Sequence, residues 1–421
     1  MKKHMRKIIV AAFILVLLAI GMISLSNFYT EEYIENEINI NINQAYIYGQ
    51  NLNINGTYKF ESEKNELKKL TLVLNKEEYT LDFKINDENE VSFTTDNSDI
   101  NKRIFLDNIK PGEYKLHLKE ETSDGTTNLY RITSDYEEEF EYYTITKNKK
   151  NNRITIEFDN EIKFNIQKKN LPSDYYDIVI DPGHGGAKQP GAVYKDIIEK
   201  EYTLKISLLV KERLEKLGYK VLLTREKDEV VGENDPYGED GRIAFAYKSK
   251  AKYFFSIHLN SHEATESGSG VEIYSPTNVD YELASSLASN IKTLAKTEYS
   301  INIKNKITDG VYVRTFGDED ISYLHELADK NNYNHYNIDT NTQYYFVIRE
   351  TGGVASGAYR DGRDGKAYNN YYNSTIGAEG YLVELGYIPN KNDYKNILNN
   401  YEEYAKGVAT GIDNYFKEMS K

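Results

Sequence analysis

The chain contains no cysteine, which excludes disulfide bonds and thiolate metal ligands. Any bound metal ion must therefore be held by histidine, aspartate or glutamate side chains. Tryptophan is also absent, while tyrosine is abundant, and we interpret this as a compositional bias without chemical meaning. The lack of cross-links is compatible with an exported protein that relies on its core for stability.

The chain has fewer basic than acidic residues, and its formal net charge is −14. Such a chain offers no broad basic surface, and no stripe of lysine and arginine alternates with aromatic residues, which excludes nucleic acid as a partner. The shares of hydrophobic residues (39%) and charged residues (28%) are those of a globular protein. At 421 residues the chain is too long for one ordinary core, so we expect two folded domains plus an anchor.

The N-terminal region combines basic residues with an uncharged run. Four basic residues within the first seven positions precede Ile8 to Leu25, about 18 residues that are just long enough to span a bilayer as a helix. Acidic residues follow from Glu31, which places the N-terminus in the cytoplasm and the rest outside. No clean cleavage site follows the run, so we predict an anchor over 1–28 and a linker over 29–43. A cleaved signal peptide, giving a secreted protein, is the alternative.

From about residue 44 to residue 170 apolar and polar residues alternate, as in Leu70–Leu74. This period of two predicts strands with one buried face and one wet face. Turn signals separate several of them: Asn55-Gly56, Pro111-Gly112 and Asp124-Gly125. We predict an all-β, immunoglobulin-like sandwich that ends in a hairpin around Asp159-Asn160. We find no catalytic constellation in it, and a spacer is the preferred role over a wall-binding module.

Beyond residue 175 the pattern becomes strand followed by helix. The β-branched run Ile178–Ile180 predicts a buried strand that Pro182-Gly183 stops, and apolar residues recur at helical spacing over 199–217. Further strands are predicted over 220–224, 253–259, 344–348 and 381–385, and further helices over 241–250, 281–296 and 401–416. This alternation predicts an α/β domain over 175–421 with a mainly parallel, helix-covered sheet.

Three residues of this domain could form a metal site. His184 lies on the loop after the first strand, where ligands bind in open α/β sheets, and the glycines around it leave room for a metal and a bulky substrate. Glu199 opens the next helix, and His258 ends a later strand. Singly they could be a loop histidine, a capping acid and a core histidine. Together, two histidines and one carboxylate leave a coordination position for water, as in catalytic zinc sites, and zinc polarises carbonyls for amide hydrolysis.

Glu384 is the remaining anomaly, since it lies in the apolar strand Tyr381–Tyr387. An unpaired carboxylate there would cost several kcal/mol or take up a proton. A general base beside the metal would explain its presence. The alternative is a buried ion pair with Arg349 or Arg225.

In order and spacing, the motifs of residues 175–417 resemble those of zinc-dependent N-acetylmuramoyl-L-alanine amidases of the type-3 family. The matching stretches are Ile-Val-Ile-Asp-Pro-Gly-His184-Gly-Gly, Pro190-Gly-Ala, Glu199-Lys, Leu223-Thr-Arg, Ser256-Ile-His258-Leu-Asn, Val347-Ile-Arg-Glu and Leu382-Val-Glu384-Leu-Gly-Tyr. The resemblance implies one zinc ion bound by His184, Glu199 and His258, with Glu384 as the catalytic glutamate. It also implies that the substrate is peptidoglycan, cut at the amide between N-acetylmuramic acid and L-alanine.

The chain departs from the family pattern in a long segment between Arg349 and Glu384. Loops of this length are often functional, and we predict that this one forms a wall of the stem-peptide groove, with Arg360 or Arg363 meeting peptide carboxylates. Asn260 and Arg349 are further predicted substrate contacts. A solvated crossover loop is the alternative.

The leading interpretation is a membrane-anchored amidase that faces the cell wall outside the cytoplasm and remodels or degrades peptidoglycan. Two other classes stay open: a catalytically silent wall-binding or regulatory protein, and a zinc carboxypeptidase that cuts elsewhere in the stem peptide. Peptidoglycan and the membrane are the expected partners. A protein activator is compatible with this interpretation, although the sequence does not identify one.

Overall fold

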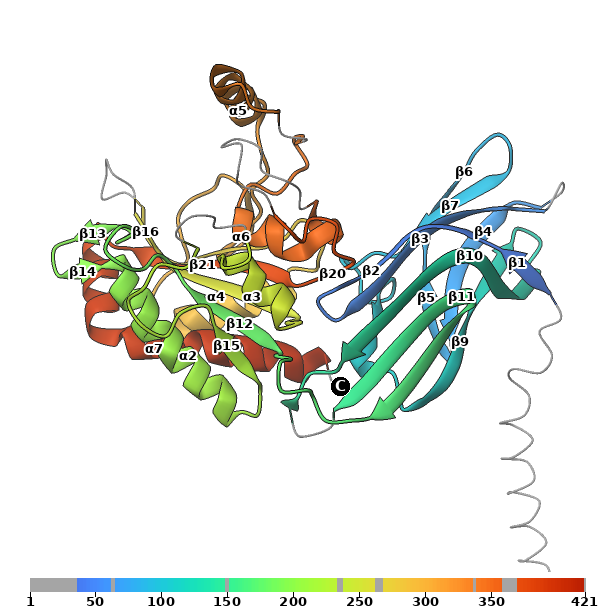
Figure 1. Cartoon of the computed structure of the whole chain (residues 1–421), viewed down its shortest axis with the longest axis horizontal. Coiled ribbons are helices and arrows are strands. Elements are labelled where there is room, and N and C mark those ends of the chain that lie inside the picture. Colours follow the sequence, from blue (N-terminus) through green and yellow to red (C-terminus); the bar gives the residue numbers. More distant parts are fainter. Residues whose placement is uncertain are drawn as a thin grey trace, which may run out of the picture.

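The computed structural model of the chain describes residues 36–61, 65–147, 151–232, 238–261, 268–335, 338–357 and 369–419. They form a β domain and an α/β domain that lie side by side (Figure 1). None of the helices in these ranges combines the length and apolar character needed to cross a bilayer. The predicted anchor Ile8–Leu25 lies outside the described residues.

The β domain consists of two sheets that pack face to face over one core. The first sheet has the strand order β1 (Glu37–Asn39), β10 (Thr127–Tyr143), β11 (Asn152–Lys168), β9 (Gly112–Thr122), β4 (Leu67–Leu74) and β5 (Glu77–Thr80). The second contains β20 (Ile376–Gly377), β2 (Asn41–Tyr48), β3 (Asn51–Lys59), β7 (Glu90–Thr94) and β6 (Asp82–Ile85), with β8 (Ile104–Phe105) paired to β3. Alternate residues of both sheets, such as Ile54 and Leu72, fill the core between them, as the period of two predicts.

Two details of this domain correct the sequence prediction. Strands β1 and β2 begin at Glu37 and Asn41, so the predicted linker to residue 43 is partly strand. The predicted hairpin around Asp159-Asn160 is wrong, because β11 continues through it and pairs first with β10 and then with β9. Asn160 has a positive φ of 54°, yet even-numbered residues are buried on both sides of it, from Ile154 to Phe158 and from Ile162 to Ile166, so the chain is not reversed there.

The α/β domain is built on a seven-stranded mixed sheet, which confirms the predicted class. Its strand order is β15 (Val221–Leu223), β12 (Ile178–Pro182), β16 (Tyr253–Asn260), β21 (Glu379–Tyr387), β17 (Glu272–Tyr274), β19 (Val311–Tyr312) and β18 (Lys306–Thr308). The first four strands are parallel, and β17 runs antiparallel to β21. A short hairpin of β13 (Val193–Tyr194) and β14 (Ile197–Ile198) precedes the first helix of this domain.

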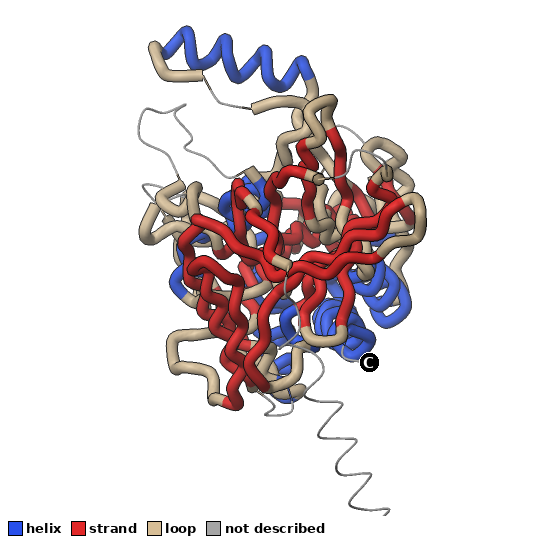
Figure 2. Tube along the Cα trace, turned by 90° about the vertical axis from the view of Figure 1, so that its right-hand side faces the viewer, coloured by secondary structure: helices blue, strands red, loops and turns tan. Residues whose placement is uncertain are grey.

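Helices cover both faces of this sheet. The described helices of this domain are α2 (Glu199–Lys216), α3 (Arg242–Lys248), α4 (Glu282–Ala295), α5 (Asp318–Asn331), α6 (Phe346–Arg349) and α7 (Lys391–Met419), with a short 3-10 helix over Glu350–Ser356. A further 3-10 helix, Leu106–Asn108, belongs to the β domain. Ile178 and Ile180 share a core with α2, α4 and α7, whereas Val179 packs with α3 and α6 on the opposite face. Helix α5 projects from the body of the molecule, which is visible in two perpendicular views (Figures 1 and 2).

Two predicted elements of this domain differ from the structure. The apolar run 344–348 contains the helical turn α6 instead of a strand, because a short continuous apolar run does not distinguish a buried strand from a buried helix. The final helix begins at Lys391, ten residues earlier than predicted, and bends at Asn400, where φ is −130°. The asparagine-rich first part has weak helix propensity, and it is held by burial of Ile397.

The two domains are joined by a shared sheet and by buried polar contacts. Strand β20, which belongs to the long segment between Arg349 and Glu384, extends the second sheet of the β domain by pairing with β2. Tyr253 donates a hydrogen bond to Gln50 across the interface at 2.8 Å, and buried Arg103 forms an ion pair with Asp280. The β domain is therefore fixed directly against the α/β domain.

Glu379 is buried at this interface and makes stability depend on pH. It is 3% exposed, and a Cβ atom at Gly49 of the β domain would lie 2.4 Å from its Oε1. Burial and the nearby Asp280 raise its pKa to about 8, although Tyr381 and Arg103 act in the opposite direction. The folded protein therefore keeps a proton on Glu379 that the unfolded chain, with a carboxyl pKa near 4.5, releases at lower pH.

We expect Glu379 to stabilise the fold fully below pH 4.5 and to lose this contribution as the pH rises to about 8. The loss should amount to a few kcal/mol, at about 1.4 kcal/mol per pKa unit. Denaturant unfolding of the unaltered protein and of Glu379→Gln between these pH values measures it, because glutamine does not titrate. Glu282→Gln, at an exposed carboxylate, is the control. Parallel stability curves for the unaltered protein and Glu379→Gln would contradict the prediction.

Candidate metal centre

The three predicted ligands come from three elements that meet at the carboxyl end of the parallel strands. His184 follows β12, Glu199 is the first residue of α2, and His258 lies near the end of β16. Strands β12 and β16 are neighbours, which brings the two histidines to one edge of the sheet, where their ring centroids lie 4.9 Å apart. Of the described residues, these three form a group whose ligand atoms lie within 4.8 Å of one another, a spacing that could hold a metal ion.

Glu199 is the centre of this group. Its Oε1 lies 3.0 Å from Nδ1 of His258, and its Oε2 lies 3.1 Å from Nε2 of His184. The backbone amides of Leu259 and Ala192 donate to the same two oxygens. Burial raises the pKa of Glu199, but the hydrogen bonds with both histidines outweigh it, so the pKa lies well below its usual range. The carboxylate is therefore ionised, as a metal ligand must be.

The donor set fits a divalent metal with an open position. Two imidazoles and one carboxylate are the ligands of a catalytic zinc site, whereas a structural site would have four protein ligands. The side chain of Glu199 is 4% exposed, while those of His184 and His258 are 31% and 21% exposed. The carboxylate is thus fixed inside, and the histidines face the accessible side from which a substrate can approach.

Glycines around the site allow the ligands to approach the backbone closely. A Cβ atom at Gly183 would lie 2.5 Å from the ring of His258. At Gly191, where φ is 69°, a Cβ atom would lie 2.6 Å from Oε2 of Glu199 and 2.7 Å from the ring of His184. His184 itself has a positive φ of 60°, an uncommon conformation for a residue with a side chain.

We expect Gly191→Ala to weaken metal binding by roughly 10-fold or more, since the new methyl group displaces the Glu199 carboxylate from both histidines. Metal affinity measured by competition with a chelator tests this. Gly125→Ala is the matched control: φ is 86° there, and nothing lies within 4 Å of an added Cβ atom. Both variants carry backbone strain of roughly 1–2 kcal/mol, so equal metal affinities would show that the collision at Gly191 is harmless.

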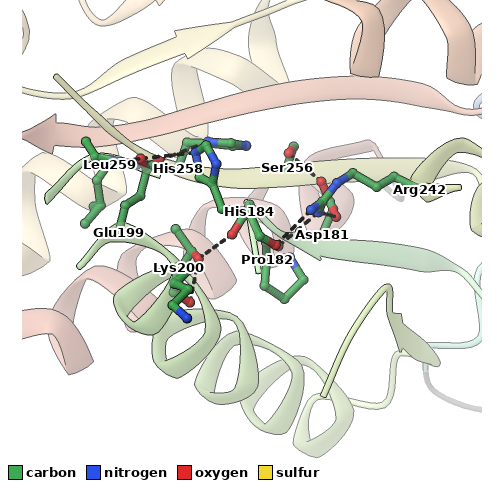
Figure 3. A network of polar contacts seen from close by, with 12 residues as sticks. Asp181, Pro182, His184, Glu199, Lys200, Arg242, Ser256, His258 and Leu259 are labelled. Atoms are coloured by element: carbon green, nitrogen blue, oxygen red, sulfur yellow. Dashed lines mark hydrogen bonds and ion pairs between the residues drawn. The ribbon is translucent and has the colours of Figure 1, made fainter. Parts of the chain in front are cut away.

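Two buried arginines hold the loop that carries His184, a role that was not predicted for either of them. Arg242 of α3 pairs with Asp181 at 2.5 Å and donates to the backbone oxygen of His184 at 2.8 Å (Figure 3). Arg225 donates to the backbone oxygens of Pro182 and Gly183 at 3.0 and 2.9 Å. The four hydrogen bonds fix the turn from β12 to His184 from two sides.

Glu384 lies on β21 in register with His258 of β16, next to the metal site. Its Oε2 is buried and has no hydrogen-bond partner in the described part of the chain. Burial raises its pKa well above the usual range, and the carboxylates of Glu199 and Glu272 add to this rise. The alternative of an arginine partner does not hold, because Arg349 pairs with Glu350 and Arg225 is bound to backbone oxygens.

The structure gives different outcomes for the four residues predicted to contact substrate. Asn260 ends β16 beside the site, with its amide nitrogen bound to Glu272. Arg349 is 2% exposed and donates to Glu350 and to two backbone oxygens, so the structure corrects the prediction that it meets substrate. Arg360 and Arg363 lie outside the described residues.

The fold and the site together define an α/β protein with a two-histidine, one-glutamate group able to hold a metal. Residues 178–414 match the N-acetylmuramoyl-L-alanine amidase family. This match covers more than half of the chain, which therefore belongs to that family, as its motifs predicted.

The chain is similar to a germination-specific N-acetylmuramoyl-L-alanine amidase of Bacillus subtilis, 35% identical over 102 residues, 22% of this chain and 41% of the relative. It is 38% identical over 96 residues to the amidase AmiC of Neisseria meningitidis, 22% of this chain and 21% of the relative. It therefore spans less than half of each of these two relatives. The crystal structure of an N-acetylmuramoyl-L-alanine amidase from Clostridium difficile is 20% identical, with a TM-score of 0.36 over 58% of this chain and 98% of that one.

Proposed function

We propose that this protein hydrolyses the amide bond between N-acetylmuramic acid and L-alanine in peptidoglycan. The observation that carries the proposal is the convergence of His184, Glu199 and His258 beside Glu384, whose Oε2 is buried without a partner among the described residues. Membership of the amidase family supports the bond and the substrate. A carboxyl group with one buried and unpartnered oxygen next to a metal-binding group has no evident structural use, whereas amide hydrolysis needs both.

We propose zinc as the metal, held by one oxygen of Glu199 and by one ring nitrogen of each histidine. When bound, zinc supplies a Lewis acid that polarises the scissile carbonyl and makes the attacking water more acidic, and its charge favours ionisation of a neighbouring carboxyl. The absence of cysteine and the ionised state of Glu199 support a site of nitrogen and oxygen donors.

In this proposal Glu384 moves the proton. Its carboxylate accepts a proton from the attacking water and then donates that proton to the leaving nitrogen of L-alanine, which could not depart as an anion. The raised pKa of Glu384 favours the second step, because an ordinary glutamate would be a weak acid catalyst for an amine at neutral pH.

We further propose that Ile8–Leu25 anchors the protein in the membrane, with the α/β domain outside the cytoplasm and facing the wall. The charge pattern around this segment supports that orientation. The β domain is proposed as an immunoglobulin-like spacer. Because β20 and the Tyr253–Gln50 contact join the domains, this spacer would present the metal site in a fixed orientation instead of on a flexible tether.

Mass spectrometry of the fragments that the purified full chain releases from peptidoglycan, with and without a zinc chelator, tests the proposal. Free stem peptides that begin at L-alanine, paired with glycan that lacks peptide and lost on chelation, are the expected result. Shortened peptides still attached to muramic acid would show a carboxypeptidase instead. No release from a zinc-loaded protein, even in the presence of extracts that could activate it, would show a binding protein.

A further inference from the structure

A second buried carboxylate faces the proposed catalytic glutamate from the neighbouring strand. Glu272 lies on β17, is fully buried, and is the cross-strand partner of Glu384 on β21. In an antiparallel pair the side chains of directly opposed residues lie on the same face of the sheet with their Cβ atoms about 5 Å apart. Two acids in this relation repel each other when both are ionised, so the fold would not keep Glu272 here without a compensating role.

Glu272 is held by four hydrogen bonds, all of which it accepts. Its Oε1 receives the hydroxyl groups of Ser300 and Tyr387 at 2.6 and 2.8 Å. Its Oε2 receives the amide of Asn260 at 3.1 Å and the hydroxyl group of Tyr274 at 2.8 Å. Four donors fill the acceptor capacity of a carboxylate. Glu272 is therefore held in place by a full set of hydrogen bonds.

The donors connect Glu272 to β16, which carries His258, and to β21, which carries Glu384. Asn260 lies two residues after His258 on β16, and Tyr387 lies three residues after Glu384 on β21. Since the Asn260 amide nitrogen is bound to Glu272, its carbonyl oxygen is directed away from Glu272. The ring of Tyr387 lies so close to Gly268 that a Cβ atom there would be 2.3 Å from it. One carboxylate thus fixes the orientation of side chains on either side of the catalytic glutamate.

We propose that Glu272 is a positioning residue for amide hydrolysis, which holds Asn260 and Tyr387 in place beside Glu384. The inference rests on the proposed function. The amide of Asn260 and the hydroxyl group of Tyr387 are thereby held in fixed orientations on the two neighbouring strands that carry His258 and Glu384.

Glu272→Gln keeps the packing but replaces one acceptor oxygen with an amide donor, which reverses the hydrogen bonds with Ser300 and Tyr387. The amide nitrogen of glutamine can take the place of Oε1, because the hydroxyl groups of Ser300 and Tyr387 can turn to accept a hydrogen bond, while Asn260 and Tyr274 still donate to the remaining oxygen. Glu120→Gln is the matched control. Glu120 is 3% exposed, accepts a hydrogen bond from Tyr58 at 2.7 Å, and lies in the β domain.

Steady-state release of stem peptides from soluble peptidoglycan fragments, metal content and thermal unfolding are measured for the full chain and both variants. We expect Glu272→Gln to lower kcat roughly 10- to 100-fold with KM within about twofold and zinc content unchanged, the range seen for residues that orient a site through others. Glu120→Gln should shift the melting temperature to a similar extent and leave kcat unchanged. Glu272→Asp, which retains the carboxyl group, should recover part of the lost kcat.

An unchanged kcat in Glu272→Gln would overturn the inference, as would a loss that Glu272→Asp does not reduce at all. A purely structural role would lower kcat only in step with the folded fraction, and Glu120→Gln sets that scale. Should Glu272→Gln fail to fold, Tyr387→Phe removes one donor and leaves Glu272 in place; kcat must then fall at least about threefold, and an unchanged value would overturn the inference. Inactivity of the unaltered protein itself would instead refute the proposed function.

Discussion

Replacement of Glu384 with glutamine is expected to slow the release of stem peptides by about 10²- to 10⁴-fold, the usual contribution of a general acid–base. Glutamine has nearly the same shape as glutamate but can neither accept a proton from water nor deliver one to the leaving nitrogen. Because Glu384 is not one of the three metal ligands, zinc content should stay at that of the unaltered protein. Rates of peptide release together with metal analysis on the same preparations measure both quantities.

The stability of Glu384→Gln separates a catalytic role from a structural one. Oε2 of Glu384 is buried without a partner among the described residues, and the raised pKa shows that the folded state disfavours the charge. A neutral amide avoids this cost, so the melting temperature of the variant at pH 7 should equal or exceed that of the unaltered protein. Glu201→Gln, at an exposed carboxylate on α2, is the control that should change neither property. Full activity in Glu384→Gln would refute its role.

The group of His184, Glu199 and His258 could be expected from the sequence because each residue follows directly from a local pattern. A β-branched run stopped by Pro182-Gly183 places His184 at a strand end, and a second apolar strand does the same for His258. The carboxyl ends of neighbouring parallel strands meet at one edge of a sheet, so two such residues converge once the strands pair. The apolar surroundings of Glu384 gave a similar signal, since an acid in a buried strand requires an explanation.

The predictions that were wrong concern features that depend on tertiary contacts, which no local sequence pattern contains. The alternation on either side of Asn160 is the same for a hairpin and for one strand whose register shifts, and only pairing with β9 distinguishes them. Arg349 has the charge that a peptide carboxylate would need. Its guanidinium group instead donates hydrogen bonds to Glu350, its neighbour in sequence, and to two backbone carbonyl groups. The joining of the two domains by β20 could not be predicted either, because a strand of two residues leaves no recognisable pattern in the sequence.

The arginines that support His184 illustrate the same limit at the site itself. Arg242 lies 61 positions after Asp181 and Arg225 lies 43 positions after Pro182, so their partners are set by the tertiary fold. The pattern in the sequence that could have revealed them is the strand that ends in Asp181, because a buried acid at that point needs a cation. The sequence thus reveals the reactive groups of a site more easily than it reveals the residues that hold those groups in place.

Arg242→Met is expected to destabilise the protein by about 3–5 kcal/mol, because it leaves Asp181 as a buried charge without its cation. Asp181 is fully buried, and its remaining donors are Ser256 and Thr224, both at 2.6 Å. Burial raises the pKa of Asp181, but Arg242 and these hydrogen bonds overcome it, so the pKa lies below its usual range. Denaturant unfolding measures the loss, and Lys248→Met on the same helix, in an exposed ion pair with Glu239, should cost less than about 1 kcal/mol.

The pH dependence of this loss follows from the same pair. Without Arg242 the pKa of Asp181 rises, so the variant can relieve the buried charge by taking up a proton. The difference in stability between the two proteins should therefore be largest near neutral pH and should narrow as the pH falls through the raised pKa. A difference that stays constant down to pH 4 would mean that lost packing, and not the unpaired charge, is responsible.

The double variant Asp181→Asn with Arg242→Met separates folding from metal binding. Removing both partners of a buried pair costs less than removing one, so it should be more stable than Arg242→Met alone. It still lacks the hydrogen bond from Arg242 to the backbone oxygen of His184, which holds that residue in its positive-φ conformation. Zinc affinity, measured by chelator competition, should therefore stay roughly 10- to 100-fold below that of the unaltered protein. Recovery of affinity together with stability would show that His184 keeps its place without Arg242.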